Sequence, residues 1–146
     1  MHANNEIGVI FPIEQLAPIA ERRGVPLHVD AVQTAGKIPV DVRALDVDFY
    51  LGGGLKWLLG GPGVAFLYAR PDLLAALRPS VTGWFAHREQ FKFDPRAFEF
   101  HDDARRLEAG TPPLMPVYAQ LGGLDVIEEV GVPAIRAATA ALTEDL

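Results

Sequence analysis

The chain has 146 residues, of which 49% are hydrophobic, and its formal net charge is −6. This composition allows one buried core, and the acidic balance offers no basic field that would attract a nucleic-acid backbone. The absence of cysteine excludes a disulfide scaffold and a thiolate metal site, and no apolar run approaches the roughly 18 residues of a membrane span. We therefore expect a cytoplasmic protein with no nucleic-acid or membrane partner.

The first half of the chain alternates between a helical pattern and strand patterns. From Pro12 to Arg23 apolar residues recur close to every 3.6 positions, which predicts an amphipathic helix that ends at Gly24. Short apolar runs predict three strands, at Val25–Val29, Asp46–Leu51 and Gly63–Ala69.

The second half is less regular. Its pattern predicts a short helix over Pro71–Leu77, an irregular stretch over Ser80–Pro113, a longer helix over Leu114–Val130 and an Ala-rich helix from Pro133 onward. Helices that alternate with strands indicate an α/β fold with a mostly parallel sheet. The chain starts directly before a polar turn and stops inside a helical pattern. We therefore expect residues 1–146 to form a partial domain, truncated at both ends.

Chemically useful side chains follow the first two predicted strands. Asp30 comes directly after the first strand, and Gln33 follows three residues later. Lys56 follows the second strand inside GGGLKWLLGGPG, a loop with six glycines that lets the backbone approach another group closely. Open α/β sheets bind ligands at the carboxyl ends of their strands, so these side chains are expected at one crevice.

This set matches the needs of an enzyme that uses pyridoxal 5′-phosphate (PLP). Such an enzyme requires a lysine for the Schiff base, a carboxylate that keeps the pyridine nitrogen protonated, and donors for the cofactor's oxygens. An isolated aspartate is more often a cap, and an isolated lysine is usually only solvated. The placement of Asp30 and Lys56 after consecutive strands favours the cofactor interpretation.

Three segments carry a family resemblance: MHANNEIGVIFPI, HVDAVQTAGKIPVDV and DFYLGGGLKWLLGGPGVAFLYAR. They resemble the core of the class V aminotransferase family, which includes cysteine desulfurases and kynureninases. The resemblance implies the large domain of a fold type I PLP-dependent transferase, without its C-terminal small domain, and a homodimer that acts on an amino-acid substrate. It implies that Asn5 and Gln33 lie near the cofactor's phenolic oxygen, Asp30 near the pyridine nitrogen, and that Lys56 forms the Schiff base.

One departure concerns the residues before the lysine. Cysteine desulfurases usually have Ser-Gly-His there, whereas this chain has Gly53-Gly54-Leu55. Two side chains that bind cofactor in those relatives are therefore missing, which weakens the desulfurase interpretation.

A further segment, VTGWFAHREQFKFDP followed by RRLEAGTPP, resembles kynureninase. That resemblance makes Trp84 and Thr111 candidates for contact with the phosphate or substrate across a dimer. Trp84 is equally typical of an aromatic anchor in a subunit interface, and Thr111 has the position of an N-cap ahead of the helix from Leu114. The aromatic residues around Trp84, interleaved with arginines, predict an interface.

Several functions remain open after this comparison. They are a class V aminotransferase-type enzyme, a kynureninase-like hydrolase, a cysteine desulfurase-like lyase, and a non-catalytic α/β fragment. The glycine loop lacks the G-x-G-x-x-G pattern of a dinucleotide site, and Lys56 is not followed by Ser or Thr as in a P-loop. We expect a structural hydrogen bond for His28, surface positions for His87 and His101, and no zinc site.

Overall fold

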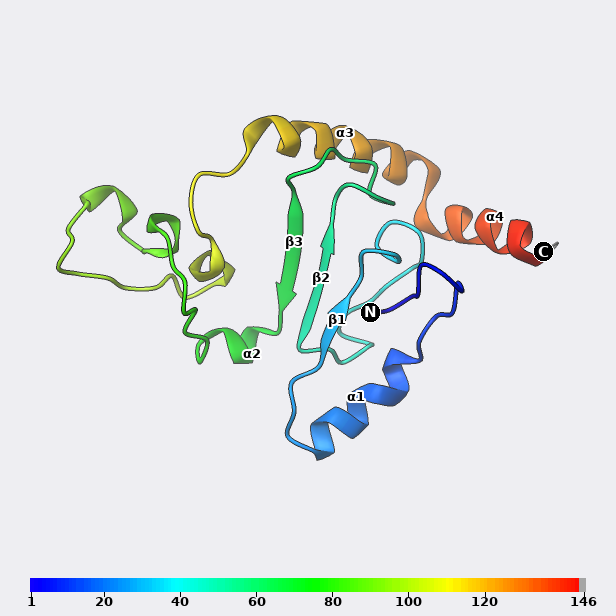
Figure 1. The fold of residues 1–146 in the computed structure, drawn as a ribbon, viewed down its shortest axis with the longest axis horizontal. Helices are drawn as coiled ribbons and strands as arrows, with labels where there is room; N and C mark the ends of the chain where they lie inside the picture. The colour runs from blue at the N-terminus through cyan, green and yellow to red at the C-terminus, as the bar shows by residue number, and fades with distance from the viewer. Residues whose placement is uncertain (145–146) are drawn as a thin grey trace. The chain divides into compact units, whose positions relative to one another are not determined.

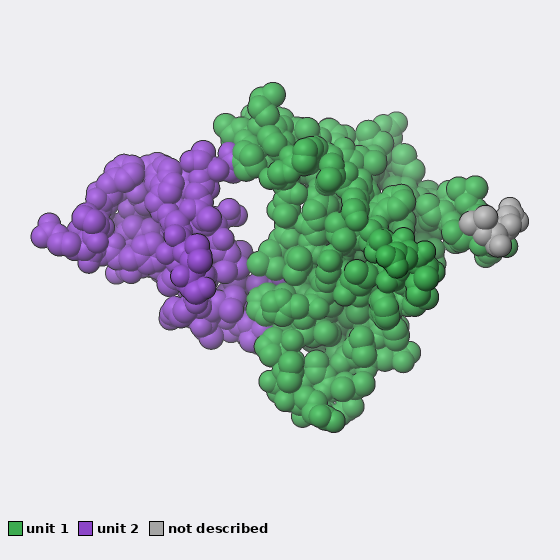
Figure 2. All heavy atoms as spheres, viewed as in Figure 1, with its two compact units in different colours: residues 1–67, 113–146 green, residues 68–112 purple. Residues whose placement is uncertain are grey.

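The computed structural model describes residues 1–144. It divides into two compact units, Met1–Leu67 with Pro113–Leu146, and Tyr68–Pro112 (Figure 2). Within the described residues no helix combines the length and the apolar character needed to span a membrane.

A three-stranded sheet forms the centre of the first unit. Its strands are β1 (His28–Asp30), β2 (Phe49–Gly53) and β3 (Ala65–Ala69), in the order β1-β2-β3. β1 and β2 are parallel, with Val29 opposite Tyr50, whereas the arrows of β2 and β3 point in opposite directions (Figure 1). The α/β expectation is confirmed, and the sheet is mixed.

The first strand begins three residues later than the sequence predicts. Val25 is 57% exposed, and Pro26 has no N–H to contribute to a ladder. The N–H of Leu27 donates to the Asp48 carboxylate at 2.7 Å, and this side-chain acceptor takes the place of a strand partner. The ladder continues beyond β1 instead, where the N–H of Ala31 donates to the carbonyl of Leu51 at 2.7 Å.

Three helices accompany this sheet, close to their predicted positions. α1 (Ile13–Arg22) buries Ile13 and Ala17 on one face, and the positive φ of Gly24 ends it. α3 (Leu114–Val130) and α4 (Val132–Glu144) follow one another, separated by Gly131 with φ of 81°. Figure 1 shows α3 passing the end of β2 at which the lysine loop lies.

A buried hydrogen-bond chain fixes the N-terminal loop to the sheet. Thr34 Oγ1 donates to the Ala31 carbonyl at 3.2 Å, so it accepts from the hydroxyl of Tyr50 at 3.0 Å. The Tyr50 oxygen then accepts from His2 Nδ1 at 3.1 Å. Burial lowers the pKa of His2, which favours the neutral ring, and the chain then requires the tautomer that carries its proton on Nδ1.

The second unit is built from short helical turns, as the irregular pattern predicts. It contains α2 (Pro71–Leu74), which is shorter than the predicted Pro71–Leu77, and the 3₁₀ turns η1 (Trp84–Ala86), η2 (Gln90–Lys92) and η3 (Ala104–Leu107). Arg106 is 6% exposed and donates to three backbone carbonyls, those of Leu74, Leu77 and His101. The guanidinium thus joins the end of α2 and the turn that follows it to the backbone at His101.

The expected surface positions of two histidines were wrong. His87 is 9% exposed and His101 is 8% exposed. His87 forms an antiparallel bridge with Phe100, its Nδ1 bonds to the backbone of Glu99, and its ring stacks on Phe98. The sequence pattern missed this because the two halves of an irregular segment pair with one another across a loop.

Gly83 allows a backbone approach that no other residue permits. A Cβ at this position would lie 1.3 Å from the carbonyl oxygen of Ala109. We expect Gly83→Ala to reduce the free energy of unfolding by about 3 kcal/mol, because backbone has to move to relieve the overlap. Denaturant unfolding followed by tryptophan fluorescence measures it.

Gly110→Ala in the same unit is the matched control. Its Cβ would meet its nearest neighbour, Trp84 Nε1, at an ordinary 3.8 Å. Equal stability of the two variants would contradict the close approach at Gly83.

Candidate active site

Asp30 lies at the carboxyl end of β1, as predicted. It is half-buried, and its Oδ1 accepts the N–H of Val32 at 2.9 Å. Its backbone carbonyl accepts from the N–H of His2 at 2.7 Å, which brings the N-terminal loop beside this strand end. No bond within residues 1–144 engages Oδ2 of Asp30. One carboxylate oxygen therefore fixes the local turn while the other can meet a ligand.

Gln33 and the lysine loop lie next to one another. Gln33 sits in the turn that follows β1, where the N–H groups of Thr34 and Ala35 both donate to the Ala31 carbonyl. Its Oε1 accepts the indole N–H of Trp57 at 3.0 Å. Because Trp57 directly follows Lys56, this bond ties the turn after β1 to the lysine after β2.

Lys56 itself is exposed, and among the described residues its ammonium has no hydrogen bond or ion pair. The other lysine of this unit, Lys37, lies over the Trp57 ring with its Nζ 4.1 Å from the centroid. Burial, with a smaller contribution from Arg136, lowers the pKa of Lys37. Of these two lysines, Lys56 is thus the one whose Nζ no contact among the described residues engages.

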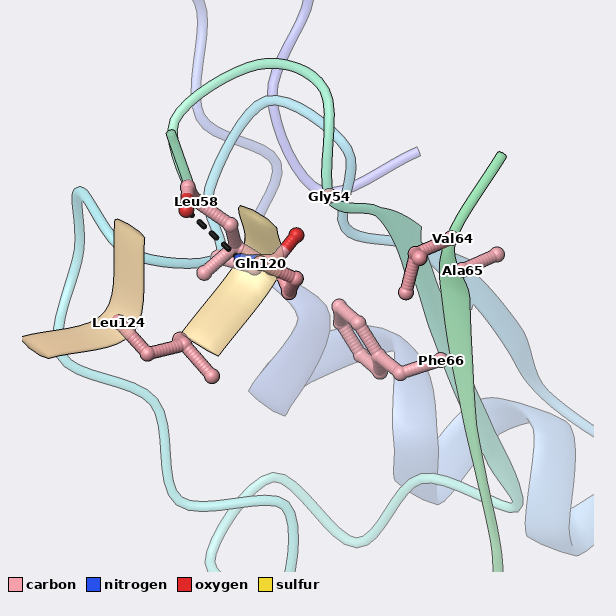
Figure 3. Close-up of a pocket in the computed structure, with 8 residues that line it drawn as sticks. Gly54, Leu58, Val64, Ala65, Phe66, Gln120 and Leu124 are labelled. Carbon is pink, nitrogen blue, oxygen red and sulfur yellow. Dashed lines mark hydrogen bonds between the residues drawn. The ribbon is translucent and has the colours of Figure 1, made fainter. Parts of the chain in front are cut away.

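The glycines of the lysine loop serve close packing against α3. Gln120 of α3 is buried, and its Nε2 donates to the carbonyl of Leu58 at 2.8 Å (Figure 3). A Cβ at Gly54 or at Gly60 would lie 1.7 Å or 2.1 Å from Gln120 Oε1. The sequence predicted a close approach at this loop, and what comes close is the amide of a helix 62 residues further along the chain.

The loop is closed by its own backbone as well. The N–H of Gly54 donates to the carbonyl of Val64, and the N–H of Gly60 donates to the carbonyl of Gly54, both at 2.9 Å. Leu59 adopts a positive φ of 56°, which costs a side-chain-bearing residue about 1–2 kcal/mol. Such a conformation persists only where the surroundings impose it, so the loop that carries Lys56 has a defined shape.

A cavity of about 330 Å³ lies beneath this loop. Figure 3 shows Phe66 and Leu124 facing it, with Gln120 between them and the loop. Gln120 Oε1 is buried there without a hydrogen-bond partner among the described residues. The lining has no titratable side chain. This cavity therefore does not suit a charged cofactor, and its lining does not include Asp30, Gln33 or Lys56.

The remaining predicted site residues are placed less tightly. Asn5 is exposed in a turn in which the neighbouring Asn4 accepts the N–H groups of Glu6 and Ile7. Trp84 and Thr111 belong to the second unit. Trp84 is 41% exposed and contacts Phe85, Phe91 and Phe93. The functional roles of all three stay predictions.

The alternative N-cap interpretation of Thr111 was wrong. α3 begins at Leu114, its N-cap residue is Pro113, and no side chain caps it. Two prolines between Thr111 and the helix hold the chain extended, so the threonine lies too early to reach the first free N–H groups.

Two residues that hold the lysine loop were missed by the sequence reasoning, Trp57 and Gln120. Trp57 directly follows the lysine. Its indole N–H can only donate, which was a signal that this side chain needs an acceptor nearby. Gln120 is a polar residue within an apolar helix, LMPVYAQLGGLDVIEEV, which is a signal of a buried hydrogen bond.

The residues present fit PLP by their donor and acceptor types. A free amine, a carboxylate with one unused oxygen and an amide with an unused NH₂ group match an aldehyde, a ring nitrogen and an anionic oxygen. Among residues 1–144 no three His, Asp or Glu side chains gather in a way that could hold a metal ion.

Comparison with known proteins identifies the family of the chain. The family model for class V aminotransferases matches residues 1–146, and the chain belongs to that family. The uncharacterized aminotransferase YcbU of Bacillus subtilis is 40% identical over 92% of this chain. Kynureninase of Pseudomonas fluorescens is 31% identical over 98% of it.

A solved structure shows the same fold. The cysteine desulfurase CsdA of Escherichia coli matches 99% of the chain, at a TM-score of 0.82 and 28% identity, and the match covers 36% of CsdA. This confirms the fold type I expectation, and PLP is confirmed as the cofactor of the family. The chain spans about a third of the length of the curated relatives, 35% of YcbU and 34% of kynureninase.

Proposed function

We propose that this chain carries the cofactor-binding core of a PLP-dependent enzyme that acts on an amino-acid substrate, with Lys56 as the amine that holds the cofactor covalently. The observation that carries the proposal is the bond between Trp57 and Gln33, which joins the lysine loop to the turn that follows Asp30. Separate strand ends thus bring a free amine, a carboxylate and an amide into one region.

PLP, when bound, supplies an aromatic ring that can accept the electrons of a broken bond at the substrate's α-carbon. Asp30 would hold a proton on the ring nitrogen, and its Oδ2 is available for this because Oδ1 is occupied by Val32. Gln33 would donate its NH₂ group to the ring's anionic oxygen. Lys56 Nζ would take and return a proton at the substrate's α-carbon.

We further propose a homodimer in which residues of one subunit complete the cofactor site of its partner. Trp84 and Thr111 would contact phosphate or substrate across the subunit boundary, and Asn5 would approach the cofactor's oxygen. Exposed aromatic residues support this: Trp84 is 41%, Phe91 72% and Phe93 71% exposed. Apolar side chains of this size are typically covered in an interface.

Within this chemistry, a kynureninase-like hydrolase is the alternative that a specific feature favours. This feature is the motif Gly83-Trp84-Phe85-Ala86-His87, which resembles kynureninase. The motif is well packed, because Gly83 lies against the backbone of Ala109 and His87 is buried. The desulfurase-like alternative is less favoured because Gly53 and Leu55 supply no polar side chain before the lysine. A Cβ at Gly53 would have room, with its nearest neighbours at 4.0 Å, so packing does not require glycine there.

Cofactor titration tests the proposal. The purified protein, mixed with PLP, should develop the visible absorbance of covalently held cofactor, and borohydride should fix the cofactor on the peptide that contains Lys56. Mapping distinguishes this lysine from Lys37 and Lys92, the other lysines of the chain. Fixation of the cofactor on Lys37 or Lys92 would overturn the proposal. Absence of any fixed cofactor would also overturn it and would favour the non-catalytic alternative.

A further inference from the structure

The hydrogen bond between Trp57 and Gln33 determines which way the Gln33 amide faces. Amide oxygen and nitrogen are interchangeable to many partners, so the orientation of a glutamine usually has to be inferred from its neighbours. Here the neighbour is an indole N–H at 3.0 Å, and an indole nitrogen can only donate. The oxygen of Gln33 must therefore face Trp57, and the NH₂ group is left for a ligand.

The indole is held in place by two further contacts. The ammonium of Lys37 lies 4.1 Å from the centre of the ring, a cation–π distance. On the backbone side, a Cβ at Gly36 would lie 2.7 Å from the Trp57 carbonyl oxygen, and Gly36 has a positive φ of 82°. The ring and the backbone of Trp57 are thus both packed against the segment that carries Gln33, although Trp57 is 41% exposed.

We propose that Trp57 is a positioning residue that makes Gln33 a pure hydrogen-bond donor toward the cofactor. The inference rests on the proposed function and deepens it. With its oxygen engaged by the indole, Gln33 presents its NH₂ group to the ligand, which can donate a hydrogen bond to an anionic oxygen but cannot accept one from a hydroxyl. The site therefore selects a ligand that presents an acceptor at this position, and Trp57 provides the selection by orienting Gln33.

Two cofactor forms measure this selection. PLP carries the ring oxygen, and 3-deoxypyridoxal 5′-phosphate lacks it. The wild-type protein should bind PLP more tightly than the deoxy form, and Trp57→Phe, which keeps a ring beneath Lys37 but removes the N–H, should reduce this preference by about fivefold, the worth of one hydrogen bond. Gln33→Ala should reduce it at least as much, and the double variant should lose no more than Gln33→Ala alone.

Trp57→His retains a ring N–H and should therefore keep part of the preference that Trp57→Phe loses. A merely structural role of Trp57 would weaken the two cofactor forms equally and leave their ratio unchanged. An unchanged ratio in Trp57→Phe would therefore overturn the inference.

A second readout does not depend on cofactor. The chain has two tryptophans, Trp57 and Trp84, so the indole N–H signals in a nitrogen-15 NMR spectrum are easily assigned. Gln33→Ala should shift the Trp57 indole signal and leave that of Trp84 in place. A Trp57 signal that does not move in Gln33→Ala would overturn the inference. If that signal moves but the wild-type protein binds no PLP, only the proposed function is overturned.

Discussion

Lys56→Ala should remove covalent cofactor binding completely, with no visible absorbance after addition of PLP and no borohydride-fixed label. The reason is that Lys56 Nζ has no contact among the described residues, whereas Lys37 is engaged with Trp57. Turnover of an amino-acid substrate should fall by about 10²-fold or more, since the variant also loses the group that moves the proton at the α-carbon. Absorbance, mass spectrometry and steady-state kinetics measure the three effects.

The fold should survive this change, because Lys56 is exposed and makes no side-chain bond in the described part of the chain. Circular dichroism and the unfolding midpoint should match those of the wild type. Lys92→Ala is a matched control, since that lysine pairs only with Glu89 at the surface of the second unit. Retention of a fixed label in Lys56→Ala would show that another amine holds the cofactor.

Asp30→Asn should separate catalysis from folding and binding. The asparagine keeps Oδ1, so the bond from the Val32 N–H survives and the turn after β1 should form as before. It has no negative charge to keep the ring nitrogen protonated. We expect turnover to fall by about 10²- to 10³-fold, the cost of removing one electrostatic stabiliser from an active site, while PLP affinity changes much less.

Asp30→Ala provides the comparison, because it removes the charge and the turn bond together and should lower both turnover and stability. Steady-state kinetics, cofactor titration and denaturant unfolding on the three proteins distinguish the roles. Near-normal turnover in Asp30→Asn would show that the carboxylate is structural, a cap of the turn and nothing more.

Local sequence patterns were sufficient for the elements whose order is set within a few residues. The bounds of α1 follow from apolar periodicity, and a glycine with positive φ ends each of α1 and α3. The α/β class followed from the alternation of patterns. Strand starts were less predictable, because whether Val25 pairs depends on Asp48, a residue that is distant in sequence and captures the N–H of Leu27.

The sequence by itself also determined the family, the candidate lysine and the candidate carboxylate, since these depend on residue type and on position after a strand. Only the tertiary structure decided what surrounds them. The Trp57–Gln33 bond and the Gln120–Leu58 bond join residues 24 and 62 positions apart, and the burial of Arg106 depends on carbonyls of α2. Contacts of this kind arise from packing between elements, on which periodicity and propensity within one segment carry no information.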